Sequence, residues 1–152
     1  MPLDPSITLY AVGASIQEDE LVQMAGCCIT LVFKDEYGRK RNRIITHPIG
    51  NASLNRAHLQ AAHLALASVV RSMRRVALVT LICPACVKAA LDDTDPEYCE
   101  IGDAVVGELR KWASFYSRLR FVSSAGEDIP GFDRARECAE SQSGSDTGTI
   151  DG

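Results

Sequence analysis

The stretch Leu54–Met73, LNRAHLQAAHLALASVVRSM, decides how the rest of this chain is interpreted. Its apolar residues recur at spacings of three and four, which is the period of one face of an α-helix. These apolar positions are Leu59, Ala62, Leu66, Val69, Val70 and Met73. Asn51 and Ser53 stand just upstream, where helix-capping residues are favoured. The sequence therefore predicts a helix over 54–73 that carries a histidine, His58, in its first turn.

Short apolar segments on both sides of this helix are typical of β-strands. The expected strands are Ile7–Ala14, Ala25–Lys34, Arg39–His47, Val76–Cys83 and Leu119–Ser123. Helical segments are expected at Pro84–Leu91, Val105–Arg118 and Phe132–Glu140. Three strands that follow one another closely, then strands alternating with helices, predict an α/β fold. Its five-stranded mixed sheet has three antiparallel strands followed by βα units, and helices flank it.

Length and composition favour a single globular domain. The chain has 152 residues, close to the soft expectation of about 150 for one domain. We place that domain at 1–140 and a polar, Gly/Ser-rich disordered tail at 141–152. No apolar run reaches the roughly 18–20 residues that span a bilayer, and the N-terminus lacks the pattern of a secretory signal. We therefore expect an intracellular protein, cytoplasmic or nuclear, that is not associated with membranes and whose six cysteines are thiols.

The net charge of −4 is unevenly distributed. The segment Lys34–Arg75 holds nine basic and two acidic residues, a local net charge of +7. Within it, Arg39, Arg41 and Arg43 alternate along an expected strand and therefore share one side of it. Such a basic surface faces either phosphate groups or an acidic partner, or it is only a solvated surface.

Five short motifs follow one another along residues 6–140. They are Tyr10-Ala11-Val12-Gly13-Ala14-Ser15, Met24-Ala25-Gly26-Cys27-Cys28-Ile29, Leu54-Asn55-Arg56-Ala57-His58-Leu59-Gln60-Ala61-Ala62, Ile82-Cys83-Pro84-Ala85-Cys86-Val87, and Ala125-Gly126 with Phe132-Asp133-Arg134-Ala135-Arg136-Glu137-Cys138-Ala139. In this order and spacing they resemble motifs of the ribonuclease H family. The resemblance implies a ribonuclease H-like fold over nearly all of the expected domain.

The same resemblance bears on catalysis. In that family four carboxylates hold two divalent metals about 3.5–4 Å apart, and the metals activate a water against a phosphodiester. Mg²⁺ requires hard oxygen ligands. The matching positions here are Val12, His58, Cys83 and Asp133, and Ser124 stands where the family has a loop histidine. One carboxylate does not assemble a two-metal centre, so we expect a degenerate, catalytically inactive member without a cofactor.

Other acidic residues keep an atypical nuclease open as an alternative. Two groups lie outside the matched positions, namely Glu18, Asp19 and Glu20, and Asp92, Asp93 and Asp95. The acidic segment Asp92–Asp103 also occupies the place of a basic insert that some family members use to grip their substrate. An acidic segment in place of a basic one favours contacts with protein over contacts with nucleic acid.

Cys83 and Cys86, in the sequence CPAC, support a further alternative. They lie at an expected strand-to-helix junction, where a helix N-terminus lowers the pKa of a thiol and favours redox chemistry. With His58 or Cys99 they also suggest a zinc site, although structural zinc needs four ligands.

Our leading hypothesis is a ribonuclease H-like domain that serves as a protein-interaction or scaffolding module in a nucleic-acid-associated assembly. The expected partners are another protein or a second copy of the chain. Nucleic acid is a further expected partner, through the basic hairpin residues Arg39, Arg41 and Arg43 together with Asn55.

Overall fold

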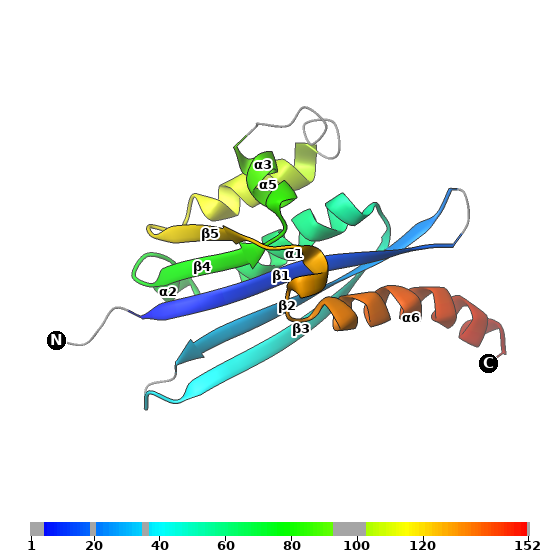
Figure 1. The fold of residues 1–152 in the computed structure, drawn as a ribbon, viewed down its shortest axis with the longest axis horizontal. Coiled ribbons are helices and arrows are strands. Elements are labelled where there is room, and N and C mark those ends of the chain that lie inside the picture. Colours follow the sequence, from blue (N-terminus) through cyan, green and yellow to red (C-terminus); the bar gives the residue numbers. More distant parts are fainter. Residues whose placement is uncertain (1–4, 19–20, 35–36, 93–102, 152) are drawn as a thin grey trace.

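Five strands form one mixed sheet in the computed structural model of the chain (Figure 1). They are β1 (Ser6–Gln17), β2 (Gln23–Lys34), β3 (Lys40–Asn51), β4 (Leu78–Cys83) and β5 (Leu119–Ser123). Their order across the sheet is β3-β2-β1-β4-β5; the first three are antiparallel, and β4 and β5 continue parallel to β1. The structure describes residues 5–18, 21–34, 37–92 and 103–151. The predicted mixed α/β sheet is confirmed.

Helices pack on both faces of this sheet (Figure 1). They are α1 (Leu54–Ser68), α2 (Arg71–Arg74), α3 (Ala85–Leu91), α5 (Asp103–Ala113), the 3-10 turn η1 (Gly126–Asp128) and α6 (Phe132–Asp151). Residues of α1, α3 and α5 share one core with the sheet, whereas α6 crosses β1, β2 and β3 on the opposite face. Within the described ranges, no helix is both long enough and apolar enough to cross a membrane.

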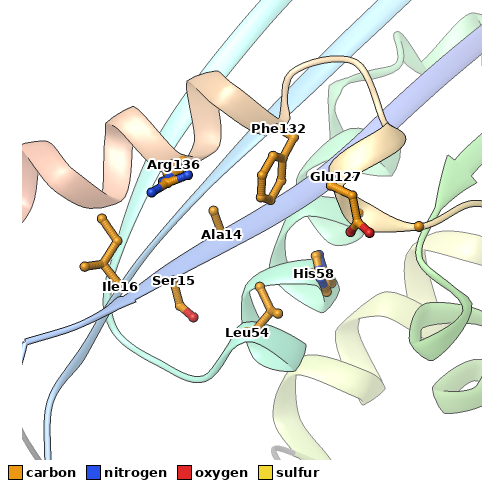
Figure 2. Close-up of a pocket in the computed structure, with 10 residues that line it drawn as sticks. Ala14, Ser15, Ile16, Leu54, His58, Glu127, Phe132 and Arg136 are labelled. Carbon is orange, nitrogen blue, oxygen red and sulfur yellow. The ribbon is translucent and has the colours of Figure 1, made fainter.

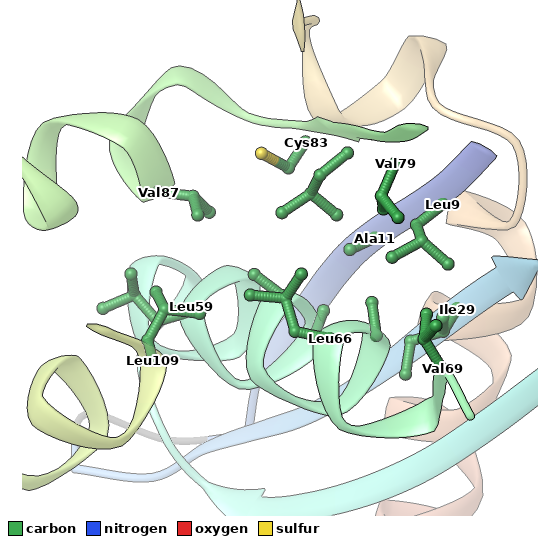
Figure 3. Packing of buried hydrophobic residues seen from close by; sticks show 14 of the residues in the cluster. Leu9, Ala11, Ile29, Leu59, Leu66, Val69, Val79, Cys83, Val87 and Leu109 are labelled. Carbon is green, nitrogen blue, oxygen red and sulfur yellow. The ribbon is translucent and has the colours of Figure 1, made fainter. Parts of the chain in front are cut away.

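The main core lies between the sheet and α1 (Figure 3). Leu9 and Ile29 from the sheet, Leu59 and Leu66 from α1, and Leu109 from α5 are all completely buried. Each such side chain contributes about 1.5–3 kcal/mol by leaving water. The spacing of Leu59 and Leu66 on one helix face is what the sequence pattern predicts.

The predicted single helix over 54–73 is wrong, because the structure has two helices there, α1 and the short α2, separated by Val69 and Val70. Ser53 caps α1 as expected, with its Oγ accepting from the Arg56 N–H at 3.2 Å. The helix ends at Ser68, because Val69 and Val70 adopt extended backbone with ψ of 133° and 139°. Two consecutive β-branched residues disfavour helix, and Arg74 Nε donates to the Val69 carbonyl at 3.0 Å. Val70 is therefore exposed and does not join the core.

The strands of the hairpins are longer than predicted. β1 continues to Gln17 and β2 begins at Gln23, so residues 15–17, beyond the predicted strand end at Ala14, pair with residues 23–25. β3 likewise runs on to Asn51, beyond the predicted strand end at His47. The pairing of β2 with β3 shifts in register between Ala25 and Gly26. Pro48 lies in this part of β3, which is an edge strand, where a residue without an N–H is tolerated.

Most other boundaries shift by a few residues. The strand expected from 76 begins at Leu78, and Pro84 precedes α3 as its N-cap instead of opening it. The helix expected to reach 118 ends at Ala113. The largest difference is α6, which continues to Asp151 although a disordered tail is predicted from 141. Gln142 explains the first turn beyond that point, because its side chain donates to the Ala25 carbonyl and accepts from the Gly50 N–H at 2.7 Å.

Candidate functional site

Helix α1 approaches β1 most closely at Gly13. A Cβ atom at this position would lie 2.5 Å from the carbonyl carbon and the Cβ of Ala57, a distance that real Cβ atoms do not reach. Only glycine therefore allows this contact without a shift of α1. The close approach places the next helix residue, His58, directly against the strand, where its Nδ1 accepts the Gly13 N–H at 2.9 Å.

The His58 imidazole is neutral and has a defined tautomer. The residue is only 6 % exposed, and burial lowers its pKa to about 4. Because Nδ1 accepts a hydrogen bond, the single ring proton resides on Nε2. His58 thus offers a hydrogen-bond donor, and binding a metal through Nε2 would require it to lose the bond to Gly13.

An open pocket of about 540 Å³ lies beside His58, between β1, α1, η1 and α6 (Figure 2). It is lined by Ala14, Ser15, Ile16, Leu54, His58, Ala125, Gly126, Glu127, Phe132 and Arg136. Gly126 keeps the ring accessible, since a Cβ there would lie 3.3 Å from His58 Cε1. Glu127 supplies the one carboxylate among these lining residues, and Arg136 extends from α6 on the other side of Phe132 (Figure 2).

Val12, at the first carboxylate position of the resemblance, is packed in hydrocarbon. It is completely buried in a second, smaller cluster on the α6 face of the sheet. The other buried members of this cluster are Ala14, Cys28, Ile129 and Ala135. A Cβ at Gly126 would lie 3.8 Å from a Val12 methyl group, so Val12 and His58 flank the same glycine. An apolar side chain at this point offers no ligand to a cation.

The other two matched positions lie elsewhere. Cys83 belongs to the main core together with Val87 (Figure 3). Asp133 lies in the first turn of α6, is exposed, and does not line the pocket. The structure therefore brings Val12 and His58 together around Gly126, and of the four matched positions only His58 lines the pocket.

The predicted lowering of the Cys83 pKa is wrong. Cys83 is 1 % exposed, and burial, reinforced by the neighbouring Cys86 thiol, raises its pKa to about 12. Desolvation outweighs any effect of the short helix α3, so Cys83 is a protonated core thiol. Among the described residues no three His, Cys, Asp or Glu side chains are grouped to hold a metal ion; Cys99 lies outside those residues.

The alternative acidic residues do not form a second site in the part of the chain that is described. Glu18 and Asp92 are exposed, neither lines the pocket, and Asp92 lies 3.5 Å from Lys88 as an exposed ion pair. Asp19, Glu20, Asp93 and Asp95 fall outside the described residues.

The basic residues predicted to bind nucleic acid lie apart from Asn55. Arg41 and Arg43 are exposed on β3, and Arg39 is exposed in the turn before it. Asn55 is in the first turn of α1, beyond the other end of β3. At about 3.3 Å per residue, the strand between Arg43 and Asn51 alone spans roughly 26 Å. The hairpin and Asn55 therefore do not form one contact surface.

The five sequence motifs contain most of the residues that line the pocket, but of these only His58 was predicted to be a site residue. Ile16 and Glu127 lie outside the motifs, and nothing in the sequence distinguishes them from ordinary surface residues. The pair Ala125-Gly126 matched a family motif, and the geometry now shows what Gly126 does, because its lack of a side chain leaves the His58 ring open to the pocket.

Comparison with known proteins identifies the fold. No protein-family model matches the chain, and no curated protein matches it. Among solved structures, RNase H1 of the halophilic archaeon Halobacterium salinarum aligns with a TM-score of 0.58 at 16 % identity, covering 88 % of this chain and 93 % of that one. The chain has the ribonuclease H-like fold.

Two further structures with the ribonuclease H-like fold extend this result. The N-terminal RNase H domain of a Mycobacterium tuberculosis protein aligns with a TM-score of 0.63 at 16 % identity, covering 93 % of this chain and 98 % of that one. LC11-RNase H1, solved in complex with an RNA/DNA hybrid, aligns with a TM-score of 0.55 at 18 % identity, covering 86 % and 93 %. At these identities the likeness establishes the fold alone.

Proposed function

We propose that this ribonuclease H-like domain binds a partner and does not cleave nucleic acid. The observation that carries the proposal is the complete burial of Val12 in an apolar cluster, at the β1 position that matches a catalytic aspartate of the family. A two-metal mechanism would need a carboxylate from elsewhere in the chain in place of the aspartate that is missing at this position.

The neighbouring groups support the same conclusion. His58 has its Nδ1 engaged by Gly13 and presents a proton at Nε2. Cys83 is protonated in the core. Glu127, the one carboxylate that lines the pocket, and Asp133 are both exposed. Two dispersed, hydrated carboxylates hold a divalent cation far more weakly than a preorganised set of oxygen ligands does.

A cleavage assay tests this proposal directly. Purified protein is incubated with an RNA/DNA hybrid and Mg²⁺ or Mn²⁺, and we expect no cleavage above a protein-free control. Matched variants Asp133→Asn and Glu127→Gln are assayed in parallel. Cleavage by the wild type that either variant abolishes would show a working nuclease and overturn the proposal.

Binding of nucleic acid without cleavage is a second candidate function. It is favoured by the exposed residues Arg39, Arg41 and Arg43 at the β2–β3 hairpin, which carries no acidic side chain between 37 and 51. Phosphate contacts by such residues make affinity fall steeply with salt. We expect hybrid binding that weakens with salt and weakens again in Arg41→Glu/Arg43→Glu; binding insensitive to both would exclude the hairpin as the contact.

A further inference from the structure

A second surface, at the other end of β4, combines exposed apolar and basic side chains. It surrounds α2, and we name it the α2 surface. Its members are Val70, Arg71, Arg75, Val76, Phe115 and Arg118. Val70, Val76 and Phe115 are 67 %, 52 % and 43 % exposed, so three large apolar side chains near α2 face solvent. The arginines beside them are exposed as well.

A chain of side-chain contacts connects α2 with the end of α5. The Arg74 guanidinium donates to the Val69 and Ala67 carbonyls and lies 4.5 Å from the centre of the Trp112 ring. Trp112 in turn packs edge-on against Phe115, with ring centres 5.6 Å apart. This chain of contacts holds the segment around α2 against the end of α5.

Two further hydrogen bonds connect residues 117–118 with the backbone of Arg74 and Val76. Arg118 donates to the Val76 carbonyl at 3.2 Å, and the Ser117 N–H donates to the Arg74 carbonyl at 3.3 Å. The exposed apolar side chains thus project from backbone that is held in place on both sides. A preorganised surface loses little entropy when a partner docks on it.

The charged members of the α2 surface are all arginines. No aspartate or glutamate occurs between 37 and 91, or between 109 and 126, and these two ranges contain every member of the surface. Arg71 and Arg75 make no ion pair within the described part of the chain. A partner that approaches here meets positive potential around an apolar centre.

We propose that the α2 surface docks an acidic peptide segment of a protein partner, one that also carries a large apolar side chain. The apolar side chain packs among Val70, Val76 and Phe115, and the carboxylates pair with Arg71 and Arg75. The inference deepens the proposed binding function and rests on it. The surface lies at the start of β4, whereas the pocket beside His58 lies beyond the end of that strand, so each can be altered separately.

Selection from a displayed library of short random peptides tests the assignment with the intact chain. We expect peptides enriched in aspartate or glutamate together with phenylalanine, tryptophan or leucine. Their affinity should fall about tenfold for Arg71→Glu/Arg75→Glu and about tenfold for Phe115→Ala. The matched control, Arg56→Glu/Arg134→Glu, makes the same charge change on exposed side chains of α1 and α6 and should leave affinity within about twofold.

Three results would overturn the proposal. One is the absence of any enriched acidic peptide. Another is binding that the Arg71/Arg75 reversal leaves unchanged, or that the control reversal at Arg56 and Arg134 weakens equally. The third is loss of single-stranded or hybrid nucleic-acid binding in the Arg71/Arg75 variant, which would assign the surface to nucleic acid. Hybrid cleavage by the protein would refute the proposed function alone, so the two failures are distinguishable.

Discussion

The two ends of the central strands differ in which side chains are buried and which are exposed to solvent. Beside the pocket, Val12 is enclosed by hydrocarbon, and His58 is buried with its Nδ1 accepting the Gly13 N–H. Around α2, apolar Val70 and Val76 face solvent among exposed arginines. Burial and charge therefore say more than the fold alone about which groups this chain leaves available for a partner.

The largest effect is expected from placing a carboxylate at the matched β1 position. Val12→Asp inserts a charge into a fully apolar cluster and should lower the free energy of unfolding by about 4 kcal/mol near neutral pH. Val12→Asn, which is similar in shape and uncharged, should lose less, about 3 kcal/mol. Denaturant unfolding of both variants measures the difference. If millimolar Mg²⁺ restored the stability of the Asp variant, this end of the sheet would bind metal after all.

The contact between α1 and β1 gives the next largest effect. Gly13→Ala places a Cβ 2.5 Å from Ala57, so α1 must move, and the free energy of unfolding should fall by about 3 kcal/mol. The control Gly107→Ala lies on α5 with open space around it and should be neutral or stabilising by up to about 1 kcal/mol. Equal stability of the two variants in thermal or denaturant unfolding would show that α1 is not held closely against β1.

The buried imidazole predicts a dependence of stability on pH. The pKa of His58 is about 4 in the folded chain and 6.5 for the unperturbed group, so the unfolded chain binds the proton first as pH falls. Its contribution is fully present above the unfolded value and is lost as pH falls towards the folded value. Between pH 7 and pH 5 the loss is about 2 kcal/mol.

His58→Asn isolates this contribution, because the amide oxygen can accept the Gly13 N–H without titrating. Urea unfolding at both pH values should show a smaller loss for the variant by about 2 kcal/mol. A variant with the same pH dependence as the wild type would place the histidine in solvent.

The smallest effect on stability should occur at the α2 surface. Arg71→Glu/Arg75→Glu changes two exposed side chains and should alter the free energy of unfolding by no more than about 0.5 kcal/mol. Thermal unfolding of the free protein measures this. A large loss would show that these arginines support the fold, and the contrast between the two ends of the strands would then disappear.

The sequence pattern predicts elements well where burial repeats at a regular spacing. Leu59 and Leu66 recur on one face of α1 and are buried as expected. Val69 and Val70 continue the same spacing, but β-branched backbone preference and the Arg74 side chain end the helix. Periodicity cannot foresee that ending, since the side chain that captures the Val69 carbonyl is also held against Trp112, far away in the chain.

The candidate site, like the fold, was predictable only in part from the sequence. The residue types at positions 12, 58 and 83 are visible in the sequence, and so is the lack of carboxylates among them. The environment of each of these side chains is not visible in the sequence. Helix position suggests a reactive Cys83, whereas three-dimensional packing buries its thiol and raises its pKa. Likewise, the tautomer of His58 depends on a contact 45 residues away in the chain.

Strand β3 lies at the edge of the sheet, which bears on whether two copies of this chain can associate through it. Its outer side has no neighbouring strand in the described sheet, and an edge of this kind can pair with an extended chain. Lys40, Arg41 and Arg43 repel an identical edge, and Pro48 cannot donate to one. A polyanion bound to the hairpin would reduce the charge repulsion, so that Pro48 would be left as the obstacle to pairing of two such edges.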